Sequence, residues 1–68
     1  MSVAKVLELT SESGISFDDA LRQGIRRASA TVSDIKAAWI SDQEVTVEDG
    51  EIRAYRVHMR VTFVLNDS

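Results

Sequence analysis

The sequence predicts an α+β fold of the order β-α-β-β, in which a three-stranded antiparallel sheet carries one helix on one face. Three observations support this fold. A short apolar run comes first, a segment with helical periodicity follows it, and two alternating segments meet at Asp49-Gly50. No low-complexity tract or linker divides the 68 residues, so we expect a single domain, residues 1–68.

The first predicted strand covers residues 3–10, which are mostly apolar apart from Lys5 and Glu8. The polar cluster at residues 11–14 follows directly and ends in glycine. Such clusters are typical of loops. The sequence therefore predicts a strand that ends at Thr10 and a loop after it.

The predicted helix begins after Ser16, which stands three residues before Asp19, as a helix N-cap does. Asp18 and Asp19 then fall in the first turn, where negative charge offsets the helix dipole. Apolar residues recur at helical spacing, and they are Phe17, Ala20, Leu21, Ile25, Ala28 and Val32. Gly24 costs about 1 kcal/mol relative to alanine. Close approach of helix and sheet would explain it, and a plain loss of helix stability is equally consistent.

Residues 35–48 and 51–65 are predicted to form a hairpin, because Asp-Gly is the preferred pair for a two-residue turn. Counting back from the turn sets the register. It places Glu48 opposite Glu51, Trp39 opposite Arg60, Ser41 opposite His58 and Gln43 opposite Arg56.

The two faces of this hairpin differ in character. One face is predicted to be core, and it carries Tyr55, Val57, Met59, Val61 and Phe63. The other face mixes basic and apolar residues, and it carries Arg56, His58 and Arg60 with Ala37, Trp39, Val45, Val47, Ile52 and Ala54. A face of this mixed kind indicates an interface or a ligand pocket rather than plain solvent exposure.

Composition narrows the class of protein. A chain this short builds a marginal core and has no cysteine to reinforce it, which favours oligomerisation. No apolar run is long enough for a membrane span and no signal-peptide pattern is present, so a cytoplasmic protein without membrane contact is expected. The net charge of −3 argues against binding to nucleic acid.

Nothing in the sequence indicates an enzyme. There is no P-loop, no dinucleotide fingerprint, no cysteine and no recognisable arrangement of Ser, His and Asp. The single histidine, His58, has no companion nucleophile, which favours a hydrogen-bonded interface residue over a base. A binding protein is the better expectation.

The whole chain resembles the dodecin family. The resemblance rests on the strand-helix-strand-strand order, the length, the pairs Arg27-Ala28, Thr31-Val32 and Asp42-Gln43, and the run Tyr55-Arg56-Val57-His58-Met59-Arg60-Val61-Thr62-Phe63. It implies a sheet partly wrapped around the helix and a hollow homododecamer with the sheets inside. It also implies storage or sequestration of a flavin at subunit contacts rather than turnover.

The flavin site implied by the resemblance carries over in part. Ala37 occupies the position of the family's stacking tryptophan, and Arg56 occupies the position of its ring-binding glutamine. Asp42 occupies an acidic position that contacts the ribityl chain in some members. Trp39 is two residues beyond Ala37 and is therefore predicted to point to the same face, from a site shifted by roughly 7 Å.

Complementary chemistry supports a flavin, either riboflavin or FMN. An electron-poor ring gains from stacking on the Trp39 indole, and its carbonyl oxygens accept hydrogen bonds from Arg56 or Gln43. Arginine also pairs with a phosphate such as that of FMN. Two alternatives stay open: Trp39 covers Arg60 in a cation–π contact, and Arg56 and Arg60 pair with acids of a neighbouring subunit.

A second reading of the resemblance is a flavin-free subtype. Tyr55-Arg56 resembles a dodecin branch that binds a cation such as calcium, and acids gather around the hairpin at Asp42, Glu44, Glu48, Asp49 and Glu51. Calcium takes six to eight oxygen ligands in irregular geometry, so acids of several subunits suit it. No EF-hand spacing is present. A ligand-free assembly is the third alternative.

Overall fold

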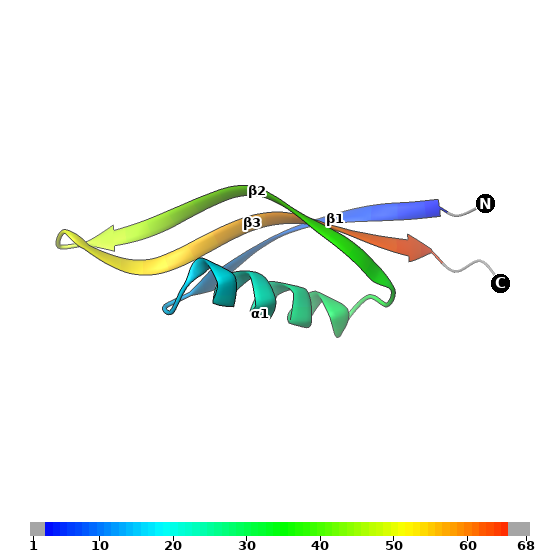
Figure 1. Cartoon of the computed structure of the whole chain (residues 1–68), viewed down its shortest axis with the longest axis horizontal. Coiled ribbons are helices and arrows are strands. Elements are labelled where there is room, and N and C mark those ends of the chain that lie inside the picture. Colours follow the sequence, from blue (N-terminus) through cyan, green and yellow to red (C-terminus); the bar gives the residue numbers. More distant parts are fainter. Residues whose placement is uncertain (1–2, 66–68) are drawn as a thin grey trace.

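The computed structural model describes residues 3–65 and confirms the predicted β-α-β-β order. Its elements are β1 (Val3–Ser13), α1 (Phe17–Ser29), β2 (Ile35–Glu48) and β3 (Glu51–Leu65). The strands form one antiparallel sheet in the order β1-β3-β2. The helix lies against one face of the curved sheet, none of residues 3–65 covers the other face, and the β2–β3 hairpin extends past the start of the helix (Figure 1).

The start of α1 follows the predicted capping pattern. Ser16 is extended, with φ −169°, and its side-chain oxygen accepts a hydrogen bond of 2.9 Å from the backbone N–H of Asp19. The helix ends at Ser29, so Val32 is not part of it, and that part of the predicted stripe is wrong. The N–H of Val32 still donates to the Ala28 carbonyl at 2.9 Å, which holds the residue close to the helix end.

The first strand is longer than predicted, because residues 11–13 continue β1 instead of forming a loop. They pair with β3, where Ser11 lies opposite Val57 and Ser13 opposite Tyr55. Ser13 is buried, and its hydroxyl donates to the Asp19 carboxylate at 2.6 Å. This hydrogen bond, with a second from Gln23, lowers the pKa of Asp19. Polar residues are accommodated at this strand end because the helix start supplies partners for them.

The core lies between the helix and the sheet. Its fully buried members are Val57, Met59 and Val61 of β3 with Ala20 of α1, which confirms the predicted core face of β3. Partly buried residues packed against them are Leu9, Phe17, Leu21, Ile25, Ile35 and Ala38. Phe17 meets Tyr55 edge to face, with ring centroids 5.2 Å apart.

Gly24 marks the closest approach of helix and sheet. A Cβ at this position would lie 2.8 Å from Met59 Cε and 2.9 Å from Ser11 Cβ. These distances are shorter than van der Waals contact, so a side chain does not fit without a shift. Of the two readings that the sequence allowed, close packing is the one that the structure supports.

The hairpin forms as predicted at its turn. Asp49 and Gly50 have φ values of 53° and 77°, and Glu48 lies opposite Glu51. Farther along, Trp39 lies opposite Arg60, again as predicted.

Between these two points the predicted register is wrong by one residue. The sheet has irregularities between Ile40 and Asp42 and between Thr46 and Val47, which displace the intervening pairs and then restore them. The observed pairs are Asp42 with His58, Gln43 with Val57, Glu44 with Arg56 and Val45 with Tyr55. The predicted pairs Ser41–His58 and Gln43–Arg56 are therefore absent. Counting from the turn failed because an extra residue in one strand shifts every following partner by one.

The bulges also change which side chains share a face. Val45 pairs with Tyr55, whose ring contacts the helix, so its predicted place on the opposite face is wrong. Asp42 and Glu44 take the face that carries His58 and Arg56. Within residues 3–65, no helix is long and apolar enough to cross a membrane.

Candidate functional site

The face of the sheet opposite α1, called the open face below, carries charged and aromatic side chains in three rows. Each row centres on an outward residue of β3 and takes one residue from β1 and one from β2. The rows are Glu8–Arg60–Trp39, Thr10–His58–Asp42 and Glu12–Arg56–Glu44. Each basic residue of β3 in these rows therefore has at least one acid as a cross-strand neighbour, and Arg56 has one on each side.

In the first row, Arg60 lies over the ring of Trp39, with its guanidinium carbon 5.2 Å from the ring centroid. This is the cation–π contact that the sequence suggested. The Arg60 Nε also donates to Glu8 Oε1 at 3.2 Å. Trp39 nevertheless stays 63% exposed. The indole is therefore held in place on one side and available to another aromatic ring or another chain.

In the second row, His58 joins β3 to both neighbouring strands. Its Nδ1 lies 2.9 Å from Thr10 Oγ1, and its Nε2 lies 2.7 Å from Glu44 Oε1. Because a carboxylate only accepts, Nε2 carries the proton of that hydrogen bond. Both ring nitrogens are engaged, which agrees with the hydrogen-bonded role predicted for this residue.

In the third row, Arg56 is held by two carboxylates. Its Nε and Nη2 donate to Glu12 Oε1 at 3.1 and 2.8 Å, and Nη1 donates to Glu44 Oε1 at 3.5 Å. The hydrogen bond to Glu12 raises the pKa of Arg56, and the one from His58 lowers the pKa of Glu44. Arg56 and Arg60 thus pair with acids of their own chain, where the sequence had suggested acids of a neighbour.

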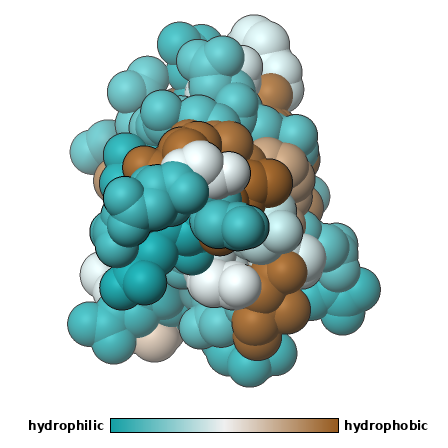
Figure 2. Space-filling view, turned by 90° about the vertical axis from the view of Figure 1, so that its left-hand side faces the viewer, coloured by the Kyte–Doolittle hydropathy of each residue, from teal (hydrophilic) through white to brown (hydrophobic). Residues whose placement is uncertain are grey.

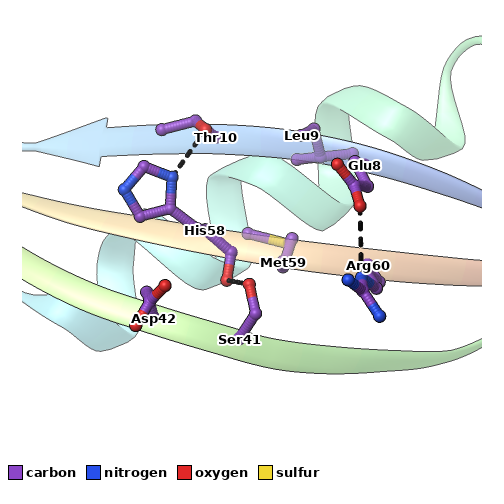
Figure 3. A pocket seen from close by; sticks show the side chains of 8 residues that line it. All are labelled: Glu8, Leu9, Thr10, Ser41, Asp42, His58, Met59 and Arg60. Atoms are coloured by element: carbon purple, nitrogen blue, oxygen red, sulfur yellow. Dashed lines mark hydrogen bonds and ion pairs between the residues drawn. The ribbon is translucent and has the colours of Figure 1, made fainter.

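A hollow of about 480 Å³ lies in the open face between the first two rows (Figure 3). Its lining residues come from all three strands and are Glu8, Leu9, Thr10, Ser41, Asp42, His58, Met59 and Arg60. A smaller hollow of about 210 Å³ adjoins it, bordered by Asp42, Gln43, Glu44 and His58. Asp42 borders both hollows, and its carboxylate has no hydrogen bond or ion pair with any of residues 3–65.

Four of the five predicted site residues share the open face. Trp39, Asp42 and Arg56 belong to the three rows, and Ala37 lies opposite Thr62 in the next row along. Gln43 does not join them, because it pairs with the buried Val57 and so belongs to the helix side of the sheet. Its predicted place opposite Arg56 is therefore wrong, because it lies in the segment displaced between the irregularities at Thr46/Val47 and at Ser41.

Sequence reasoning missed the contribution of β1. Glu8, Thr10 and Glu12 alternate along that strand and supply a partner to every basic residue of the open face. Their period of two was a signal in the sequence, but the strand was predicted to end at Thr10. Ser41, the bulge residue, donates from its hydroxyl to the His58 carbonyl at 3.1 Å.

No metal centre is formed by one chain alone in the described range. Residues 3–65 contain no group of three or more His, Cys, Asp or Glu side chains placed to hold a metal ion. A cation site on the open face would need oxygen ligands from a second chain.

The hairpin end exposes apolar side chains as well. Val47 and Ile52 lie opposite each other there and are 63% and 55% exposed. Viewed from this end of the molecule, the surface is mainly hydrophilic with separate apolar patches (Figure 2). Among residues 3–65, nothing covers these two side chains.

The fold and its open face define a class of small α+β proteins in which a helix covers one side of a three-stranded sheet and a polar, tryptophan-bearing surface occupies the other. A model of the dodecin family matches residues 3–66. The chain belongs to the dodecin family.

Individual relatives agree with this assignment. A protein named calcium dodecin from Mycobacterium tuberculosis is 32% identical over 63 residues, which cover 93% of this chain and 89% of the relative. The structure of dodecin from Streptomyces coelicolor superimposes with a TM-score of 0.93 at 25% identity, over 98% of this chain and 96% of that one. A structure of the M. tuberculosis calcium dodecin, described as calcium chelating with a novel calcium-binding site, gives a TM-score of 0.84 at 32% identity, with coverage of 98% and 96%.

Proposed function

We propose that this chain is a dodecin-type binding protein that assembles into a hollow homododecamer, with the open faces inside, and stores or sequesters a flavin without catalysis. The ligand is riboflavin or FMN. Family membership supports the assembly, and the chemistry of the open face supports the ligand.

Two features of the chain support self-association. The fully buried core consists of four side chains on one side of the sheet, which is small for a free-standing domain. Trp39, Val47 and Ile52 are each more than half exposed. Such side chains gain most from burial against another copy of the chain, because apolar surface removed from water contributes roughly 25 cal/mol per Å².

The exposed indole of Trp39 is the observation that carries the flavin proposal. It lies under Arg60, which lines the hollow, and its exposed side offers a flat apolar surface to a planar ring. Ala37, on the same face, adds no bulk that would block a ring from approaching. Asp42 borders the hollow and accepts hydrogen bonds from hydroxyls of a ribityl chain.

The sequence predicts that Arg56 donates hydrogen bonds to the flavin ring, but in this proposal it is a less direct donor. Its Nε, Nη1 and Nη2 already donate to Glu12 or Glu44, so it contributes to the ligand only by releasing one of these carboxylates. Arg60 lies closer to Trp39 and carries a single hydrogen bond to Glu8. The donor nearest to a stacked ring is therefore Arg60.

The same geometry favours binding over catalysis. Both nitrogens of His58 are occupied, and the chain has no cysteine. A flavin stacked on indole inside a closed shell is quenched and shielded from reactive encounters, which suits storage.

A fluorescence titration tests the flavin proposal. Riboflavin and FMN are titrated with the assembled protein while flavin emission and stoichiometry are followed. Strong quenching near one flavin per chain is expected, and Trp39→Ala should abolish it while light scattering shows an intact particle. Trp39→Phe is the matched control, because it keeps an aromatic ring and should retain part of the quenching. Absence of quenching by the unmodified protein would overturn the flavin proposal.

Calcium binding is a second candidate, favoured by the 32% identity to a protein named calcium dodecin. The open face carries the carboxylates of Glu8, Glu12, Asp42 and Glu44. Residues 3–65 of one chain form no metal-binding group, so the ligands would come from chains related by a symmetry axis. Calorimetric titration with calcium, and light scattering with a chelator, would reveal this site as heat of binding and chelator-dependent assembly. Neither effect would appear in a flavin carrier without a cation site.

A further inference from the structure

We propose that Ser29, the last residue of α1, is the acceptor for phosphorylation by a serine kinase that recognises a pair of arginines. Arg26 and Arg27 lie three and two residues before it, and the small Ala28 follows them. The site uses no residue of the open face. Its exposure in the particle rests on the proposed assembly, because α1 lies on the side of the sheet opposite the open face and is therefore outside the shell (Figure 1).

The two arginines of this segment are available to an acidic partner. Both are exposed, and neither makes a hydrogen bond or an ion pair with any of residues 3–65. Arg22, one turn earlier, is instead paired with Asp18 at 2.9 Å. Guanidinium groups bind carboxylates in bidentate pairs, and kinases select substrates by charge patterns of this kind. Arg26 and Arg27 therefore fit a cleft whose carboxylates receive the two residues at these distances before the acceptor.

The hydroxyl of Ser29 is available as the acceptor. The residue is exposed, and its Oγ makes no hydrogen bond within residues 3–65. In the transfer, this Oγ forms a bond to the γ-phosphorus of a nucleoside triphosphate. The bond from that phosphorus to the bridging oxygen breaks, and the hydroxyl proton passes to the base of the kinase. The products are phosphoserine and a nucleoside diphosphate.

The end of α1 is built to open locally, which a kinase requires because it takes its substrate segment as an extended chain. Among residues 26–31, Ala28 is the only buried residue. The helix ends in Ala30 with φ −76°, and the N–H of Ala30 donates to the Arg27 carbonyl at 3.2 Å. A helix end with so few buried contacts opens at a small part of the free energy of global unfolding.

Phosphorylation would remove the positive charge of this end of the helix. A phosphoserine carries about −1.5 to −2 charges at neutral pH, which offsets the charges of Arg26 and Arg27. Arg26 lies one turn before Ser29 and so within reach of the phosphate. Twelve such groups would add about −18 to −24 charges to the outside of the particle and alter which molecules it attracts.

The test treats the assembled protein with ATP and the catalytic subunit of cyclic-AMP-dependent protein kinase, which selects serines after paired arginines. Intact mass and peptide fragmentation give the extent and the position of phosphorylation. Ser29→Ala is compared with Ser33→Ala, which removes an exposed serine that follows Ala30, Thr31 and Val32 instead of arginines. Arg27→Gln is compared with Arg22→Gln, which removes the same charge from the helix outside the recognised segment.

The unmodified chain should take up one phosphoryl group, at Ser29. Ser29→Ala should abolish the uptake, and Ser33→Ala should leave it unchanged. Arg27→Gln should lower kcat/KM by at least about tenfold, because it removes a charged hydrogen-bonding partner, and Arg22→Gln should change it by less than about twofold.

No uptake by the unmodified particle, uptake at another residue, or equal losses in Arg27→Gln and Arg22→Gln would overturn the inference. Light scattering before the reaction keeps the two proposals apart. A monomer that takes up phosphate at Ser29 would contradict the proposed assembly and support the site, and an intact particle that takes up none would do the reverse.

Discussion

The two faces of the sheet are built from neighbouring residues of the same strand and differ in almost every property. On the helix side, Val57, Met59 and Val61 are buried and pack against the helix. On the open side, the residues between and beside them are Arg56, His58 and Arg60, which pair with acids and with Trp39. The period of two in a strand assigns one set to the core and the other to a polar surface.

The difference between the two faces separates the residues that stabilise the chain from those that we expect to bind other molecules. Buried apolar side chains stabilise a fold by about 1.5–3 kcal/mol each, while exposed ion pairs contribute little. The three rows of the open face therefore contribute little to the free energy of unfolding of one chain. We infer that they order the strands for association and for ligand binding.

Charge reversal on the open face should have the largest effect. Arg60→Glu places a carboxylate beside Glu8 and removes the cation over Trp39, so the assembly should dissociate. Arg26→Glu on the exposed side of the helix makes the same change in charge and should leave the particle intact. Light scattering of both variants checks this, and equal effects would mean that the open face is not the buried one.

Truncation in the core should have the next largest effect. Met59→Ala removes a fully buried side chain and should lower the free energy of unfolding by about 2–5 kcal/mol. His58→Ala, one residue away on the open face, should lower it far less. Urea unfolding measures both, and comparable losses would contradict the contrast between the faces.

Gly24→Ala should destabilise the chain although alanine favours helices. The new Cβ would meet Ser11 Cβ at 2.9 Å, and overpacking of this kind costs about 1–3 kcal/mol against about 1 kcal/mol gained in helix propensity. Gly14→Ala is the control, because nothing lies within 4 Å of a Cβ there. A thermal melt in which Gly24→Ala is the more stable variant would refute the close packing.

The smallest expected effect is on how steeply the stability of the folded chain falls at low pH when Glu44 on the open face is changed. The hydrogen bond from His58 lowers the pKa of Glu44 below its usual 4.5, so the folded state holds this carboxylate ionised more firmly than the unfolded state. Its contribution to stability is present above pH 4.5 and is lost as pH falls through the lower folded pKa. Glu44→Gln should make acid unfolding less steep, and Glu48→Gln at the hairpin end should leave it unchanged. Acid titrations followed by circular dichroism would show identical curves for the three proteins if the hydrogen bond had no influence.

Much of the fold was accessible from the sequence, because its signals are local. Ser16 predicted the helix start and Asp49-Gly50 predicted the hairpin turn, and both are confirmed. The extension of β1 past Thr10 was missed, because its polar residues find partners only at the helix start and on β3.

The candidate site was predicted less completely, for a physical reason. Its rows depend on register, and the irregularities at Thr46/Val47 and at Ser41 place Asp42 and Glu44, rather than Gln43, on the open face. No propensity in the sequence marks these irregularities. Trp39 and Arg60 were paired correctly because they lie beyond the segment that is displaced.

The most direct test of the central claim, that the open face is covered by other copies of the chain, is the mass of the unmodified particle in solution. Multi-angle light scattering after size exclusion should give a single species of about twelve chains. A monomer of 7.5 kDa would contradict it, because the open face would then be a plain solvent surface.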